Sequence, residues 1–291
     1  MNKLPLERRV QVVNALIEGC SIRSTVRLTG VAKNTVIKLL VGVGTACREY
    51  QNRVMRNLPC TRLECDEIWS FCAMKKKNVP AEREGEFGIG DVWTWTAIDA
   101  ETKLIPTWLV GLRNAEDAQT FVCDLAARLA NRVQLTTDGL RVYIEAVEAA
   151  FGGAVDYAIL HKIYGLPTGD ESRYSPPQCI GCEKHGIVGQ PDPELISTSY
   201  VERQNLTMRM KMRRFTRLTN AFSKKVENHA HAVALHFMHY NFARVHQTLR
   251  STPAMRARVT DHLWSIEEIV QMTENERFEE NGVPENNPVS N

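Results

Sequence analysis

The order of strand-like and helix-like segments between residues 63 and 160 constrains the fold of this chain most. Residues 92–98 alternate in polarity and carry aromatic and threonine side chains, as strands do. The predicted strands are 63–72, 92–98, 104–111, 133–137 and 155–160, and the predicted helices are 115–131 and 140–151. Three strands followed by helix, strand, helix and strand predict an α/β domain, with helices on the faces of a mixed sheet.

The first 42 residues predict three short helices. Ser21 is a candidate N-cap for the second helix, and Gly30 lies in a tight turn before a third helix that begins near Lys33. Apolar residues at helical spacing would pack the last two helices together: Val26, Val31, Val36 and Leu39. The residues left exposed on the third helix suit base edges and phosphates: Lys33, Asn34, Thr35 and Lys38. We therefore predict an all-α helix-turn-helix DNA-binding domain over residues 1–45, although other three-helix bundles show a similar pattern.

Basic residues are concentrated in two segments, although the formal net charge of the chain is only +2. Residues 1–62 hold eleven Lys and Arg against three acids, and residues 203–225 hold eight Lys and Arg with no acid. Two such segments indicate two surfaces for a polyanion such as DNA. Solvated helix faces are the alternative interpretation.

Three carboxylates stand out by their positions. Asp66 lies inside an apolar strand, Asp138 follows a later strand, and Glu202 opens a helix just before the second basic segment. A carboxylate in an apolar strand is unfavourable unless it is paired or bound to a cation. Such oxygen atoms suit Mg²⁺, and two ions together promote phosphoryl transfer.

Each acid also has a structural interpretation. Asp66 has the acidic neighbours Glu64 and Glu67, so some of these side chains could face solvent. Asp138 and the glycine after it form a common turn dipeptide. Residues 199–202 fit a capping box, in which Glu202 would stabilise the helix start. Because side chains alternate along a strand, Glu67 is expected to point away from Asp66 and away from any metal site.

Several blocks together resemble the DDE transposases of bacterial insertion sequences, and most closely the insertion-sequence-one type. The blocks are ECDEIWSF (64–71), VWTWTAID (92–99), TTDGL (136–140), YVERQNLTMR (200–209), FTRLTNAFSKK (215–225), HYNFARVHQTLR (239–250) and Thr252–Pro253. The resemblance covers about residues 5–255, and residues 165–194 do not align with it.

This resemblance implies an RNase H-like fold with two Mg²⁺ or Mn²⁺ ions held by Asp66, Asp138 and Glu202. It implies hydrolysis at transposon ends and attack of the new 3′-OH on target DNA. It also points to Arg209 as a DNA contact; Arg213 and Arg214, in the same acid-free segment, are further candidates. The partners would be double-stranded DNA and a second copy of the chain, because two DNA ends must be paired. A DNA-binding regulator with a degenerate nuclease fold and a nuclease without strand transfer are the alternatives.

The cysteines raise a separate question. No secretory segment is evident, so the eight cysteines are expected to be reduced and the protein cytoplasmic, bound to the bacterial nucleoid and not to a membrane. Cys179, Cys182 and His185 have the spacing of half a zinc site, and His161 is a candidate fourth ligand. Ordinary reduced cysteines in a loop are the alternative.

The predicted organisation has four parts. Residues 1–45 form the DNA-binding domain, 46–61 a helical linker, and 62–255 the catalytic domain with an insertion near 165–195. Residues 256–291 form a C-terminal helix and an acidic tail, disordered from residue 275.

Overall fold

The computed structural model describes residues 4–165, 178–216 and 220–280. The strands are β1 (Arg62–Cys72), β2 (Gly90–Asp99), β3 (Trp108–Gly111), β4 (Gln134–Thr137), β5 (Asp156–Gly165) and β6 (Gln178–Val188). The α-helices are α1 (Leu6–Ile17), α2 (Ile22–Thr29), α3 (Lys33–Val54), α4 (Ala115–Ala126), α5 (Val142–Phe151), α6 (Ser199–Lys211), α7 (Val226–Met238), α8 (Pro253–Arg256) and α9 (Ile266–Glu280). A π-helical turn, His239–Ala243, extends α7.

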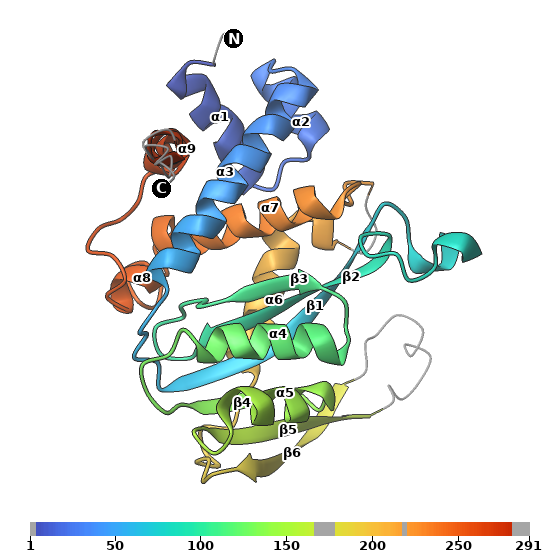
Figure 1. The fold of residues 1–291 in the computed structure, drawn as a ribbon, viewed down its shortest axis with the longest axis vertical. Coiled ribbons are helices and arrows are strands. Elements are labelled where there is room, and N and C mark those ends of the chain that lie inside the picture. Colours follow the sequence, from blue (N-terminus) through green and yellow to red (C-terminus); the bar gives the residue numbers. More distant parts are fainter. Residues whose placement is uncertain (1–3, 166–177, 217–219, 281–291) are drawn as a thin grey trace, which may run out of the picture.

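One six-stranded mixed sheet organises the molecule, in the order β3-β2-β1-β4-β5-β6 (Figure 1). Strands β1, β4 and β5 are parallel, whereas β2, β3 and β6 pair antiparallel with their neighbours. The prediction of a mixed sheet flanked by helices is confirmed. Parallel pairing of β1 with β4 matters most, because it brings the ends of two distant segments to the same region.

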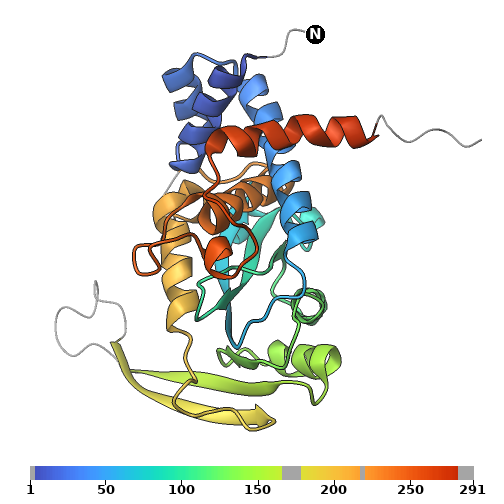
Figure 2. The same cartoon turned by 90° about the vertical axis from the view of Figure 1, so that its left-hand side faces the viewer.

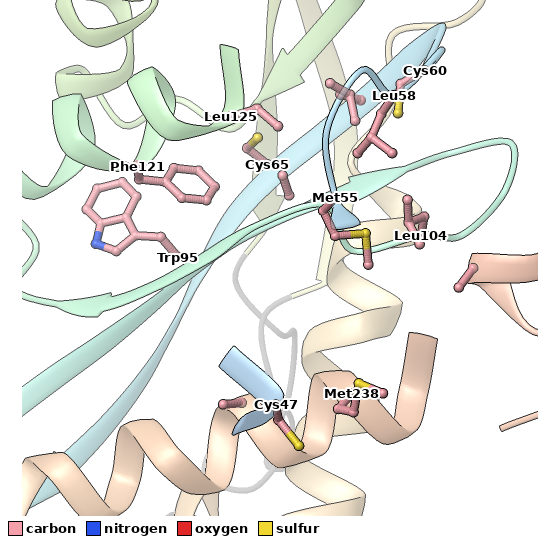
Figure 3. Packing of buried hydrophobic residues seen from close by; sticks show 14 of the residues in the cluster. Cys47, Met55, Leu58, Cys60, Cys65, Trp95, Leu104, Phe121, Leu125 and Met238 are labelled. Atoms are coloured by element: carbon pink, nitrogen blue, oxygen red, sulfur yellow. The ribbon is translucent and has the colours of Figure 1, made fainter. Parts of the chain in front are cut away.

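Each face of the sheet buries a different set of side chains. On one face, Cys65 and Trp95 pack among Phe121 and Leu125 of α4 (Figure 3). The Trp95 ring also meets Tyr143 of α5 edge to face. Burying one such side chain stabilises the fold by about 1.5–3 kcal/mol. On the opposite face, a second cluster joins the sheet to α6 and α7: Ile68, Ile98, Val201, Met208, Val233 and Phe237.

The N-terminal helices have a small core of their own and also join the main core. The side-chain oxygen of Ser21 accepts the Ser24 N–H at 3.1 Å, and Gly30 has φ +67°, as expected for the cap of α2 and the turn after it. Val12, Val31 and Val36 form the small core. Helix α3 continues without a break into the predicted linker and ends at Val54, and its residues Val43, Ala46 and Cys47 belong to the main core. Helix α9 packs across α1 and α3 (Figure 2).

The segment predicted as a long loop is partly a strand. Strand β5 continues to Gly165, and β6 returns beside it with irregular register near Tyr164. Strand β6 was not predicted, because this segment is rich in glycine and charged residues and lacks a strand-like alternation. The strand forms by pairing with β5. Residues 166–177 of that prediction lie outside the described residues.

The C-terminal part also differs from the prediction. Residues 275–280, predicted to be disordered, continue α9, whereas residues 281–291 lie outside the described residues. The predicted helix 199–225 ends at Lys211. No helix in the described part of the chain combines the length and the hydrophobicity that a membrane crossing requires.

Candidate metal centre

Two of the predicted acids meet where β1 and β4 stop pairing. The last paired residues are Cys65 and Thr137, so Asp66 and Asp138 follow directly on neighbouring parallel strands. The Asp138 side chain accepts the Leu140 N–H at 3.0 Å, which holds the turn after β4. The ring of the exposed His161 lies close over Gly139, so a larger side chain there would have to displace this ring.

A third carboxylate, Glu67, completes a compact group. One oxygen from each of Asp66, Glu67 and Asp138 lies within 4.8 Å of the others, the only such group of potential ligands within the described ranges. The expectation that Glu67 points away from the site is therefore wrong. Its side chain does face the α4–α5 side of the sheet, where it bonds Tyr143. The group forms just past the last β1–β4 pair, Cys65 and Thr137, and there the Glu67 carboxylate still comes close to those of Asp66 and Asp138.

Burial and mutual repulsion raise the pKa values of two of these carboxylates. Burial raises the pKa of Asp66 to about 7, and the charges of Glu67, Asp138 and Glu202 add to this effect. Burial and Asp138 also raise the pKa of Glu67, although Arg113 opposes them with an ion pair at 2.6 Å. The hydroxyl of Tyr143 donates to Glu67 at 3.2 Å. Hard oxygen donors that resist ionising together fit a divalent cation, whose charge would stabilise the ionised form.

Glu202 lies beside this group but outside it. It contributes to the raised pKa of Asp66, yet its carboxylate binds Lys162 of β5 and accepts the Thr198 hydroxyl at 2.6 Å. Asn205, one turn further along α6, donates to Asp66 at 2.8 Å. Helix α6 therefore reaches the carboxylates from the face opposite α4 and α5. The capping box considered as an alternative role for Glu202 is not formed, because the N-cap residue is Thr198 and its side chain makes no capping hydrogen bond.

The predicted DNA-contacting side chains have different environments. Lys33, Asn34 and Lys38 are exposed on α3, whereas Thr35 is half-buried. In the second basic segment, Arg209 and Arg213 are also exposed.

Arg214 differs from the other predicted DNA contacts because its guanidinium turns inward. It donates to the Ser223 hydroxyl at 2.8 Å, and burial lowers its pKa. The same hydroxyl contacts the buried ring of His229 at 2.8 Å. Arg214 therefore anchors the segment that follows α6.

The predicted zinc ligands are only partly together. Cys179 and Cys182 have their sulfur atoms 3.9 Å apart on the exposed strand β6. The His185 ring instead lies against His161, with centroids 5.4 Å apart, and near Glu183 at 3.6 Å. Cys179, Cys182 and His185 therefore form no compact ligand group in the described part of the chain. All eight cysteines are free thiols.

Residues missed by the sequence analysis surround the carboxylates: Glu67 as a member, and Arg113, Lys162 and Asn205 as partners. Only Asn205 carried a local signal, because three residues after Glu202 is one helical turn and the same helix face. Arg113 and Lys162 come from other elements, so their roles depend on tertiary packing.

Comparisons with known proteins find similarity among solved structures but not among sequences. The sequence matches no protein-family model and no curated protein sequence. Among solved structures, the chain is similar to the piggyBac transposase in its synaptic complex with hairpin DNA. The TM-score is 0.43 with 10% sequence identity, over 98% of this chain and 77% of that chain.

Proposed function

We propose that this chain is a DNA transposase that cleaves the ends of an insertion sequence and joins them to target DNA. The observation that carries the proposal is the convergence of Asp66 and Asp138 from neighbouring parallel strands, with Glu202 placed beside them by α6. The motif resemblance of the same three acids supports it. A shared acidic site at neighbouring strands of a mixed sheet suits metal-dependent phosphoryl transfer.

The compact group of Asp66, Glu67 and Asp138 fits Mg²⁺ or Mn²⁺. By the motif resemblance, Asp66 and Asp138 would hold the ions together with the neighbouring Glu202. When bound, these ions supply Lewis acidity and activate the attacking oxygen. The remaining tasks belong to the chain. Asn205 orients the Asp66 carboxylate, and Arg113 and Tyr143 hold Glu67. Lys162 binds Glu202 in the protein alone, and it would have to release this carboxylate before Glu202 could bind a cation.

DNA is the proposed substrate, bound through two basic regions. Helices α2 and α3, joined by a three-residue turn, would read the transposon end as a helix-turn-helix. The exposed Arg209, towards the end of α6, and Arg213, just after it, would contact the reacting strand. Because two ends must be joined together, the active species is expected to be a dimer or larger.

The test is cleavage and joining of the flanking DNA ends in Mn²⁺ by wild type, Asp66→Asn, Asp138→Asn and Glu202→Gln. Each variant keeps the side-chain shape but removes a charged oxygen, so we expect loss of product with DNA binding retained. Glu148→Gln, at an exposed site on α5, is the matched control and should react like wild type. Wild-type cleavage without joining would favour a nuclease, and binding without either product would favour a regulator.

A further inference from the structure

Glu64 caps helix α6 from a different part of the chain. It is fully buried on β1, two residues before Asp66 and on the same face of the strand. Its Oε2 atom accepts the backbone N–H groups of Tyr200 at 2.7 Å and Val201 at 3.0 Å, in the first turn of α6. These amides have no partner within a helix, and a carboxylate is a favourable acceptor there.

A second contact fastens α6 to the same strand. Asn205 donates to Asp66 at 2.8 Å, so consecutive turns of α6 are bound to Glu64 and to Asp66. Glu202 lies between these two points of attachment. The ring of Tyr200 is also held, with the Lys103 Nζ atom 3.2 Å from its centroid.

Because Glu64 belongs to β1, its capping of α6 can position this helix on the sheet as well as stabilise it. Ser or Thr at the start of α6 would stabilise the helix equally well without binding it to the sheet. Locally, the Ser197 hydroxyl accepts only the Ser199 N–H at 3.1 Å, and the Thr198 hydroxyl donates to Glu202. The next two amides, of Tyr200 and Val201, are bound from β1. The position of α6 along β1 therefore depends on Glu64.

We infer that Glu64 is a positioning residue: by gripping the first turn of α6, it sets the position of Glu202 relative to Asp66 and Asp138. The inference rests on the proposed function, in which Glu202 completes the metal site. Loss of Glu64 should displace Glu202 and weaken metal binding. Outer partners that orient metal ligands typically contribute about 10- to 100-fold in metal affinity or activity.

The experiment compares Glu64→Ala, Glu64→Gln and Asn241→Ala with wild type. Asn241 is the matched control: it is fully buried, and its amide bonds the backbone of Ile105 at 3.0 Å, away from the carboxylates. Mn²⁺ binding is measured by calorimetry without DNA, and amide hydrogen exchange is followed at Tyr200 and Val201. The Mn²⁺ concentration for half-maximal cleavage is the third measurement.

For Glu64→Ala we expect the Kd for Mn²⁺ to rise about tenfold or more, with faster exchange at both amides. Glu64→Gln keeps an acceptor oxygen and should recover part of the affinity, and it serves if the alanine variant does not fold. Asn241→Ala should lower thermal stability and leave the Mn²⁺ affinity unchanged.

Unchanged Mn²⁺ affinity in both Glu64 variants, or an equal loss in Asn241→Ala, would overturn the inference. Wild-type protein that binds no Mn²⁺ would overturn it together with the metal site. If wild type binds Mn²⁺ but cleaves no DNA, the proposed function fails, and the measured affinities still decide the role of Glu64.

Discussion

At the scale of single residues, Asp66 combines burial with three acidic neighbours, and both raise its pKa to about 7 from the ordinary 3.8. The folded protein without metal therefore holds a proton on this group more tightly than the unfolded chain does. Stability from this difference is fully present below about pH 4 and is lost as pH rises towards 7. A bound divalent cation should restore it by favouring the ionised carboxylates.

Replacing Asp66 with Asn should therefore stabilise the metal-free protein at pH 8 by about 2 kcal/mol, since one pKa unit corresponds to about 1.4 kcal/mol and the neighbouring acids share the shift. The difference should disappear near pH 4, where wild type is protonated. Urea unfolding in a chelating buffer at both pH values measures it. Mn²⁺ should raise the Tm of wild type more than that of the variant. An Asp66→Asn protein less stable than wild type at pH 8 would show that repulsion is absent.

The acids at the site were predicted from the sequence only as far as local pattern allows. An isolated Asp in an apolar strand and another at a strand end were visible in the pattern, and the structure brings these two together. Glu67 was predicted to lie outside the site, because strand alternation gives the face from which a side chain leaves the backbone. It does not give the position of the carboxylate at the end of that side chain. Glu64 was hidden for another reason: its partners are 136 and 137 positions away in sequence.

At the scale of elements, α6 carries both an acidic residue proposed to bind metal, Glu202, and a basic residue proposed to bind DNA, Arg209. Arg209 follows Glu202 by seven residues, nearly two helical turns, so both project from the same side of the helix and both are exposed. A guanidinium group can grip a phosphate with two hydrogen bonds. We propose that Arg209 holds the reacting DNA strand.

Arg209→Ala should lower the rate of strand joining by about tenfold or more, because hydrogen bonds to charged groups contribute about 1.5–3 kcal/mol. Arg209→Lys should restore only part, since lysine lacks the planar fork. Joining is measured at saturating protein, so that affinity does not enter. Arg203→Ala is the matched control on the same helix, because Lys211 is already bound to Glu18. Equal joining rates for Arg209→Ala and Arg203→Ala would show that Arg209 contributes only non-specific positive charge.

The third helix offers a second test at this scale. Asn34→Ala should reduce the preference for the cognate end by about 1–3 kcal/mol, because Asn suits a base edge. Lys38→Ala should weaken binding to every sequence and lower the salt slope by about one. Binding titrations with cognate and scrambled ends at several salt concentrations separate the two effects. Identical losses on both DNAs for Asn34→Ala would remove its proposed role in sequence reading.

Elements differed in how well the sequence predicted them. The central strands and helices were predicted because each has its own periodicity. Strand β6 was missed, because its glycines and charges do not alternate and its backbone is satisfied by β5. The join between the third helix and the linker was also missed, because Gly42 and Gly44 weaken a helical pattern that tertiary packing maintains.

At the scale of the whole molecule, α3 and α7 cross where Gly44 contacts His231. A methyl group at Gly44 would come within 2.5 Å of the His231 Cβ atom and within 2.7 Å of its backbone oxygen. Gly42, two residues earlier in the same helix, is exposed, and a methyl group there would have no neighbouring atom within 4 Å. The two glycines thus differ in their surroundings but share the same helix.

Gly44→Ala should destabilise the protein by about 1–3 kcal/mol, because the helices must separate. Gly42→Ala should stabilise it by about 0.5–1 kcal/mol, because alanine favours a helix and nothing obstructs it. Urea unfolding of the two variants gives both values. If Gly44→Ala proved as stable as Gly42→Ala, the crossing of α3 and α7 would be looser than the structure has it.

The unbroken helix α3 would fix the distance between the DNA-reading residues and the carboxylates. Its 22 residues span about 33 Å at 1.5 Å per residue, from the exposed Asn34 region into the core that supports the carboxylates. A stiff arm of fixed length would keep a constant offset between the base pairs that are read and the bond that is cut. One base pair inserted between them should therefore shift the cut by one nucleotide relative to the transposon tip, and leave its distance from the reading site unchanged.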